Sequence, residues 1–276
     1  MNGMVAVIQM NSGSDRSANL HQAGVLMGQA VAQGARLLVL PENFAHMGSN
    51  EVEKLAHAED PWDGPSLSSL REFSMRNRVW IVGGTIALAT PGGEKITNTC
   101  FVVDDHGEVR GRYDKIHLFD VSLSVDRHYR ESNLVQAGNQ PVVCDTPWGR
   151  LGLAICYDVR FPTLFARLVA MGATILTLPS AFTATTGAAH WELLVRSRAV
   201  ENFCYMLAPG QCGRHPGGRM THGHSMIVEP WGMIVAQCPE GIGFALAPVD
   251  GDRVESCRQQ IPSWKGDGGS GQLHLE

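Results

Sequence analysis

The chain has 276 residues, of which 44% are apolar and 18% charged, with a formal net charge of −5. This composition is typical of a globular protein with a substantial core and excludes a disordered chain. No basic stripe is visible in the sequence, so nucleic acid is not an expected partner. No apolar run approaches the roughly 20 residues of a membrane helix, so no membrane association is expected.

Seven cysteines are spread along the chain, and no two of them form a Cys-x-x-Cys pair. Their odd number and wide spacing argue against a disulfide framework and against a structural zinc site. The cysteine pattern therefore predicts a reducing compartment, and we expect a cytoplasmic location.

Apolar runs typical of strands alternate with segments of helical period along the chain. Helices are expected at residues 17–33, 67–77, 162–171, 190–202 and 250–260. Strands are expected at residues 5–10, 35–40, 79–87, 98–104, 108–113, 142–144, 151–155, 173–178, 204–208, 223–228, 233–237 and 244–247. Loops are expected at 179–187 and at 114–140, the latter being of a length that is uncommon unless the loop has a function. The alternation predicts an α/β fold with helices outside a mixed sheet or two sheets.

We find neither an internal repeat nor an interdomain linker in the sequence. A single domain is therefore expected over residues 1–262. The Gly- and Ser-rich residues 263–276 are expected to form a mobile tail.

Cys156 lies between an apolar run that ends at Ile155 and a helix-like segment that begins near Pro162. The free backbone N–H groups of such a junction favour a thiolate and hold an oxyanion that forms when sulfur attacks a carbonyl or nitrile carbon. The alternative is a buried cysteine that only packs, which is the commoner role of a free cysteine.

Two charged residues end strands of the same character. Glu42 follows the apolar run at 35–40, at the end of a strand where ligands of α/β sheets bind, and it is suited to act as a general base. Lys115 follows the strand at 108–113 and would stabilise negative charge beside a thiolate. The alternatives are a helix cap or salt bridge for Glu42 and a solvated surface position for Lys115.

These three residues lie in motifs that resemble the nitrilase superfamily of carbon–nitrogen hydrolases. The matching motifs are Leu40-Pro41-Glu42, Tyr113-Asp114-Lys115-Ile116-His117-Leu118 and Ile155-Cys156-Tyr157-Asp158-Val159-Arg160-Phe161-Pro162. The resemblance covers residues 5–262 and implies a four-layer α-β-β-α sandwich with a Glu-Lys-Cys triad. It also implies a homodimer or higher homo-oligomer, a small-molecule amide as substrate, and no metal or organic cofactor.

The resemblance assigns further residues to the site. Glu131, in the loop after the lysine, would position lysine and substrate, and the backbone N–H of Tyr157 would help to hold the oxyanion. Arg160 would pair with a substrate carboxylate, while Phe182 and Thr186 would contact the acyl chain. The structural alternatives are a solvated loop charge for Glu131, a tie to a helix end for Arg160, core packing for Phe182 and a helix cap for Thr186.

The resemblance also indicates a branch of the family. Tyr157 stands where true nitrilases tend to carry tryptophan, which favours amides over nitriles as substrates. The motif at 156–162, with Trp191-Glu192 and 196–199, is similar to the branches that act on deaminated glutathione and on α-ketoglutaramate. The segments 211–215 and 223–226 favour the former, so we expect an amidase that cleaves the ω-amide of deaminated glutathione through a thioester.

Other functions remain alternatives at this point. Within the family, these are an ω-amidase for α-ketoglutaramate or α-ketosuccinamate and, less favoured, an aliphatic amidase, carbamoylase or nitrilase. A different cysteine hydrolase would use a histidine base such as His117 or His190. A non-enzymatic partner-binding protein and a transferase with the same acyl-enzyme complete the set.

Overall fold

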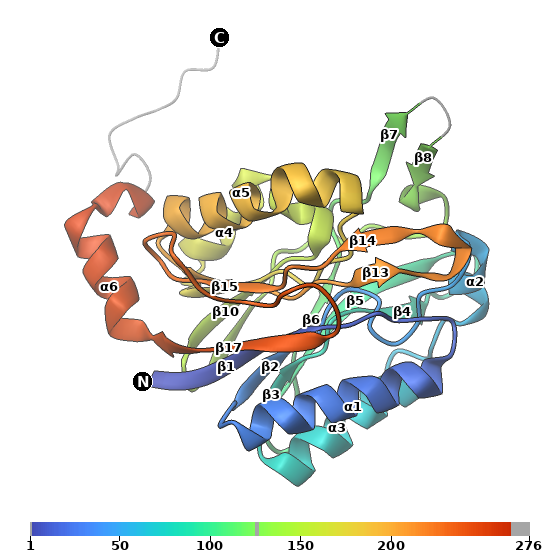
Figure 1. Cartoon of the computed structure of the whole chain (residues 1–276), viewed down its shortest axis with the longest axis horizontal. Helices are drawn as coiled ribbons and strands as arrows, with labels where there is room; N and C mark the ends of the chain where they lie inside the picture. The colour runs from blue at the N-terminus through green and yellow to red at the C-terminus, as the bar shows by residue number, and fades with distance from the viewer. Residues whose placement is uncertain (1, 125–126, 266–276) are drawn as a thin grey trace.

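One sheet of the fold has seven strands and contains both the first and the last strand of the chain (Figure 1). The computed structural model describes residues 2–124 and 127–265. The strand order is β17-β1-β2-β3-β5-β4, with β6 paired to β5, and β1, β2 and β3 run parallel. The strands are β1 (Asn2–Gln9), β2 (Leu37–Val39), β3 (Trp80–Val82), β4 (Ile86–Ala89), β5 (Ile96–Val103), β6 (Val109–Asp114) and β17 (Gly243–Asp250).

A second sheet of six strands has the order β16-β15-β12-β11-β10-β9, with β10, β11 and β12 parallel. Its strands are β9 (Val143–Thr146), β10 (Gly149–Leu153), β11 (Ile175–Thr177), β12 (Tyr205–Ala208), β15 (Met226–Val228) and β16 (Ile234–Gln237). Two hairpins lie outside the sheets, and they are formed by β7 (Asp120–Ser124) with β8 (Arg127–Arg130) and by β13 (Cys212–Arg214) with β14 (Met220–His222).

The helices form the two outer layers (Figure 1). Helices α1 (Arg16–Ala32) and α3 (Pro65–Asn77) cover the first sheet, and α4 (Pro162–Ala170) and α5 (Ala184–Asn202) cover the second. Helix α2 (Glu51–Ala56) is short, and α6 (Gly251–Gln260) follows β17. The architecture is the expected α-β-β-α sandwich. Among the described residues, no helix is both long and apolar enough to cross a membrane.

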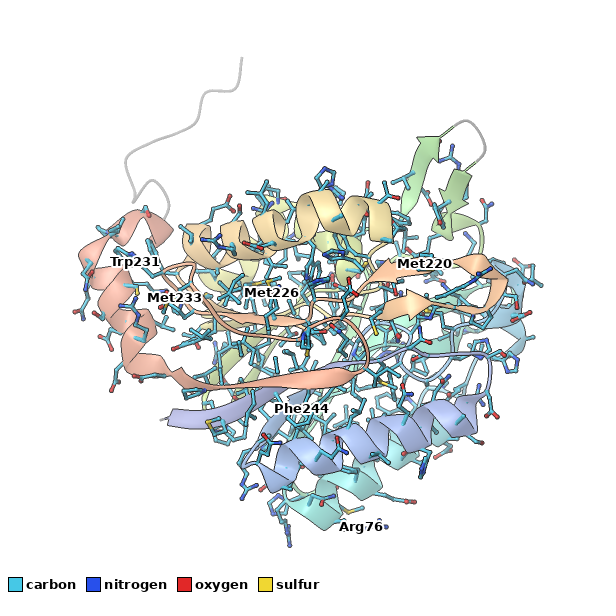
Figure 2. The ribbon with its side chains drawn as sticks, in the orientation of Figure 1. Arg76, Met220, Met226, Trp231, Met233 and Phe244 are labelled. Carbon is cyan, nitrogen blue, oxygen red and sulfur yellow. The ribbon has the colours of Figure 1, made fainter. Side chains whose placement is uncertain are left out.

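The alternation of side chains along β1 explains the layers. Val5 and Val7 belong to the core between the two sheets, whereas Ala6 and Ile8 belong to the core beneath α1 and α3. Successive side chains of a strand point to opposite faces, so a strand covered on both faces is a continuous apolar run. Figure 2 shows the side chains that fill the space between the layers.

The strand predicted at 79–87 is interrupted, which was not expected. β3 ends at Val82 and β4 begins at Ile86, and Gly84 between them has φ +52°. A Cβ at Gly84 would lie 2.2 Å from the carbonyl oxygen of Pro41. Thr85 Oγ1 accepts a hydrogen bond from the N–H of Asn43 at 2.8 Å. The break therefore holds the backbone on both sides of Glu42.

Helix α5 begins at Ala184, whereas the helix was predicted from residue 190. Thr183 is its N-cap, and the Thr183 hydroxyl accepts a hydrogen bond from the N–H of Thr186, which satisfies one of the first N–H groups of the helix. The predicted loop at 114–140 contains the β7–β8 hairpin. Of the predicted tail, residues 266–276 lie outside the described residues, while Pro262–Lys265 form a 3₁₀ turn.

Candidate active site

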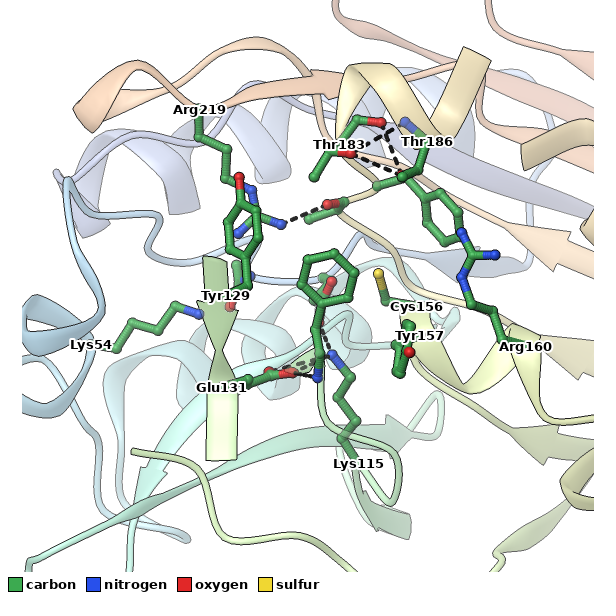
Figure 3. A pocket seen from close by; sticks show the side chains of 15 residues that line it. Lys54, Lys115, Tyr129, Glu131, Cys156, Tyr157, Arg160, Thr183, Thr186 and Arg219 are labelled. Carbon is green, nitrogen blue, oxygen red and sulfur yellow. Dashed lines mark hydrogen bonds and ion pairs between the residues drawn. The ribbon is translucent and has the colours of Figure 1, made fainter. Parts of the chain in front are cut away.

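A pocket of about 520 Å³ opens at the carboxyl ends of β2, β6 and β10, where the two sheets meet (Figure 3). All the residues that the sequence assigned to the site line this pocket, although they come from distant parts of the chain. They are Glu42, Lys115, Glu131, Cys156, Tyr157, Arg160, Phe182 and Thr186.

Glu42 lies three residues beyond the end of β2 and is 3% exposed. Its Oε1 accepts hydrogen bonds from Lys115 Nζ at 2.9 Å and from Asn98 Nδ2 at 3.0 Å. Its backbone carbonyl accepts a third hydrogen bond, from Gln211 Nε2 at 3.0 Å. The carboxylate is thus fixed from two strands of its own sheet.

Lys115 directly follows β6 and is 2% exposed. Its Nζ donates to Glu42 at 2.9 Å and to Glu131 Oε2 at 3.0 Å, so the ammonium joins two carboxylates. Burial lowers the pKa of Lys115, but the charges of Glu131 and Glu42 outweigh burial and hold that pKa well above its ordinary value. Lys115 is therefore a permanent positive charge at neutral pH.

Glu131 begins the 3₁₀ turn Glu131–Asn133 and is 7% exposed. Besides Lys115, its carboxylate accepts a hydrogen bond from the N–H of Phe119 at 2.7 Å. Burial raises the pKa of Glu131, and the charges of Lys115 and Lys54, with that N–H group, bring it below its ordinary value. Glu131, which the resemblance assigned to position the lysine, forms an ion pair with it.

Cys156 begins the 3₁₀ turn Cys156–Arg160 that follows β10, and its φ of +47° lies in the left-handed region that favours glycine. Its N–H donates to the carbonyl of Pro179 at 2.9 Å. Burial and the charge of Glu42 raise the pKa of the Cys156 thiol, although Lys115 and the Ala181 N–H act in the opposite direction. The sequence predicted a thiolate. In the structure, burial of the sulfur and the facing Glu42 carboxylate act against the thiolate.

Asp158 holds the backbone around Cys156, a role that the sequence did not reveal. It is fully buried, and its Oδ2 accepts hydrogen bonds from the N–H of Ile155 and from the hydroxyl of Tyr113, both at 2.8 Å. Its Oδ1 lies 2.7 Å from Nδ1 of His117. One carboxylate therefore links the cysteine turn to the segment that carries Lys115.

Arg160, Phe182 and Thr186 all line the pocket, and Figure 3 shows Arg160 and Thr186. The Arg160 guanidinium lies 5.6 Å from the centroid of the Phe182 ring and 6.0 Å from that of Tyr157. Thr186 is in the first turn of α5, and its hydroxyl is 2.8 Å from that of Thr183. Of the three side chains that were assigned to substrate contacts, Arg160 and Phe182 pack together, and Thr186 also caps α5 with Thr183.

Lys54 and Arg219 also line the pocket and were not predicted. Lys54 lies on α2, and Arg219 lies just before β14, with its Nη2 donating to the carbonyl of Ala181 at 2.8 Å. The Arg219 guanidinium is 5.7 Å from the ring centroid of Tyr129, another lining residue. A six-residue helix and a three-residue strand carry too little periodicity to be found from sequence.

The family model for carbon-nitrogen hydrolases matches residues 4–259. The chain belongs to the carbon–nitrogen hydrolase family. The deaminated glutathione amidase of a Synechocystis species is 43% identical over 263 residues, which cover 94% of this chain and 96% of that protein. The mouse deaminated glutathione amidase is 40% identical over 94% of this chain and 81% of its own length.

Solved structures of similar proteins have the same fold as this carbon–nitrogen hydrolase. The Caenorhabditis elegans NitFhit protein gives a TM-score of 0.89 at 37% identity, and the match covers 96% of this chain and 65% of that one. Saccharomyces cerevisiae Nit3, a member of branch 10 of the nitrilase superfamily, gives a TM-score of 0.86 at 32% identity over 95% of this chain and 94% of its own.

The two histidines considered as alternative bases have other contacts in this carbon–nitrogen hydrolase. The His117 ring is held by Asp158 and stacks on Phe161 with centroids 3.6 Å apart. Nδ1 of His190 lies 3.2 Å from Nη2 of Arg160. Neither is among the described residues that line the pocket, which argues against a Cys–His pair.

Within residues 2–124 and 127–265, one group of side chains has the spacing of a metal site, and it lies at the β5–β6 turn. It comprises Asp104, Asp105 and His106. The Asp104 carboxylate accepts hydrogen bonds from the N–H groups of His106 and Glu108 and pairs with Arg110. Its oxygens thus stabilise the turn itself.

In the pocket, the space between the Glu42 and Glu131 carboxylates is occupied by the Lys115 ammonium.

Proposed function

We propose that this carbon–nitrogen hydrolase is an amidase that cleaves the ω-amide C–N bond of deaminated glutathione and releases cysteinylglycine. The observation that carries the chemistry is the buried line from the Cys156 thiol through Glu42 and Lys115 to Glu131. The choice of substrate is supported by deaminated glutathione amidases that are 40–43% identical to this chain over most of its length. No metal or organic cofactor takes part in the proposed steps.

The first half of the reaction forms a thioester. The Glu42 carboxylate takes the proton of the Cys156 thiol while sulfur attacks the amide carbon. The oxygen of the tetrahedral intermediate becomes negative and is stabilised by the Lys115 ammonium and the N–H of Tyr157, which lies in the first turn of a 3₁₀ helix. Protonated Glu42 then gives its proton to the nitrogen, and the amine leaves.

The second half reverses these roles. Glu42, again ionised, takes a proton from water as the water oxygen attacks the thioester carbon. The tetrahedral intermediate expels the sulfur, which recovers its proton from Glu42, and the acid leaves the pocket. Lys115 needs to stay charged in both halves, and its raised pKa supports this requirement.

A substrate panel tests the proposal. Release of cysteinylglycine from deaminated glutathione is compared with release of ammonia from α-ketoglutaramate, simple aliphatic amides, carbamoyl amino acids and nitriles. We expect the highest kcat/KM for deaminated glutathione. A preference for α-ketoglutaramate would assign the ω-amidase function instead, and turnover of nitriles alone would contradict the amidase assignment.

We further propose a cytoplasmic location, supported by the seven cysteines, each of which is free and buried. A homodimer is proposed as well, because apolar side chains are exposed around α5. Trp231 and Met233 (Figure 2) are 46% and 62% exposed, and Val200 and Leu193 on α5 are 42% and 66% exposed. Size-exclusion chromatography with light scattering measures the mass of the particle in solution. We expect twice the mass of one chain.

A further inference from the structure

The charge of the pocket is opposite to that of the whole molecule. The lining residues include four cations (Lys54, Lys115, Arg160 and Arg219) and two carboxylates (Glu42 and Glu131), while the chain carries a formal net charge of −5. A concave site with a surplus of positive charge attracts anions and guides them inward. The surplus of two matches a ligand with two negative charges.

Lys54, Arg160 and Arg219 form the cationic rim of the pocket, and they lie in two groups. Arg160 packs against Tyr157 and Phe182 on one side of the sulfur. Arg219 packs against Tyr129, and Lys54 lies close enough to Glu131 to lower the pKa of that carboxyl. Figure 3 shows Arg160 on one side of Cys156 and Lys54 with Arg219 on the other. Cationic side chains therefore lie at both ends of the space around the nucleophile.

The position of the proton donor decides which end of the pocket receives the leaving amine. Glu42 must face the leaving nitrogen in order to protonate it. The line of ion pairs continues from Glu42 through Lys115 to Glu131. The charge of Lys54 lowers the pKa of Glu131, so Lys54 lies at the Glu131 end of this line. The nitrogen therefore points toward the side of Lys54 and Arg219, and the acyl chain points toward Arg160.

On the basis of the proposed function, we infer that Arg219 and Lys54 form a second carboxylate subsite that binds the leaving-amine half of the substrate. The ligand class is a linear amide with a carboxylate at each end, one on the acyl half at Arg160 and one on the amine half at Arg219 and Lys54. Guanidinium binds carboxylate with two parallel hydrogen bonds. The Nε of Arg219 is buried and has no hydrogen-bond partner among the described residues, so it is available as a donor. The subsite selects an amino acid or peptide as leaving group over ammonia.

A pair of substrates that differ only in the terminal carboxylate tests the subsite. One is deaminated glutathione, and the other is its analogue with the glycine carboxylate converted to a carboxamide. The measured quantity is the ratio of kcat/KM for the acid to kcat/KM for the amide. We expect a ratio of about 10 to 100 for the wild-type protein, the value of one or two charge-assisted hydrogen bonds.

Arg219→Gln is expected to lower this ratio about tenfold or more, and Arg219→Lys is expected to restore part of it. Lys54→Gln reports on the same subsite without touching the contact of Arg219 with Ala181, and it is expected to lower the ratio about threefold to tenfold. Arg76→Gln is the matched control. Arg76 is exposed on α3, in the outer layer on the other side of the two sheets from α4 and α5 (Figure 2). It removes the same charge and should leave the ratio at the wild-type value.

The outcomes separate the two proposals. If neither substrate is hydrolysed, the proposed function fails. If both are hydrolysed with equal kcat/KM, or if Arg219→Gln and Lys54→Gln keep the wild-type ratio, the amidase function stands and the second carboxylate subsite is refuted.

Discussion

The floor of the pocket is buried, whereas its cationic rim is partly exposed. Glu42, Lys115, Glu131 and Cys156 on the floor are between 2% and 7% exposed, and each is held by strand ends or by another member. Lys54, Arg160 and Arg219 on the rim are partly exposed and come from short elements. Coulomb interactions are strong in a buried, water-poor site and are screened at a wet rim. The floor should therefore respond to mutation as a unit, and the rim residue by residue.

The largest effect is expected for Cys156→Ala. Without the sulfur no thioester forms, so turnover of deaminated glutathione should fall by about 10⁴-fold or more, as for other covalent nucleophiles. Steady-state assay with thermal melting of the variant checks this. Cys238→Ala removes a thiol that is also buried but lies outside the pocket, and it should keep wild-type turnover. Comparable losses in the two variants would break the distinction between the floor and the rest of the core.

Glu42→Gln should separate two properties of the thiol. Amide hydrolysis should fall about 10²- to 10⁴-fold, because glutamine cannot carry the proton. Alkylation of Cys156 by iodoacetamide at neutral pH should become faster, because loss of the neighbouring negative charge lowers the pKa of that thiol. Mass spectrometry after timed alkylation gives the second rate. Amide hydrolysis at the wild-type rate in Glu42→Gln would show that Glu42 does not have the role proposed.

Asn98→Leu tests whether the floor acts as a unit. Asn98 lies on β5, is 4% exposed, and its Nδ2 donates to Glu42 at 3.0 Å and to Glu131 at 3.3 Å, so it joins the two carboxylates. Loss of this donor should lower kcat about tenfold, the value of one hydrogen bond to a charged group, and move the acid limb of the pH profile.

Cys100→Ala is the control for Asn98→Leu. Cys100 is two residues along the same strand, lies in the core between the sheets, and is buried. The control should lower the melting temperature while leaving the pH profile in place. An equal shift of the profile in both variants would assign Asn98 a purely structural role.

The smallest effect is expected at Thr183, which lines the pocket and caps α5. Thr183→Ala should lower the free energy of unfolding by about 1 kcal/mol, the usual value of an N-cap side chain. Thr163→Ala, at an exposed position in the first turn of α4, should leave stability within about 0.5 kcal/mol of wild type. Urea denaturation measures both. A stability equal to wild type for Thr183→Ala would show that the cap is not needed.

The same division between floor and rim explains what could be predicted from the sequence. Glu42, Lys115 and Cys156 each follow a strand that the sequence predicted. Because β2 and β6 belong to one sheet and β10 to the other, only the resemblance to the nitrilase superfamily implied that these residues converge and that the fold has four layers. Lys54 and Arg219 were not predicted at all, because a helix of six residues and a hairpin strand of three have no usable period.

Two residues that hold the floor in place were missed for a different reason. Asn98 reads as an ordinary member of a strand, and Asp158 reads as part of the cysteine motif. Their partners come from chain segments that only the tertiary structure brings together, for instance Asn98 with Glu42 and Asp158 with Tyr113. The sequence also did not reveal that the Cys156 sulfur is buried beside Glu42, which raises the pKa of its thiol.

Rapid mixing with deaminated glutathione, acid quenching within milliseconds and mass spectrometry of the digested protein test the central claim most directly. The account predicts an α-ketoglutaryl group bound as a thioester on Cys156. This thioester should form at the rate at which cysteinylglycine is released and decay at the rate at which the ketoacid is released. An acyl group on another residue, or full turnover with Cys156 unmodified at every time point, would contradict it.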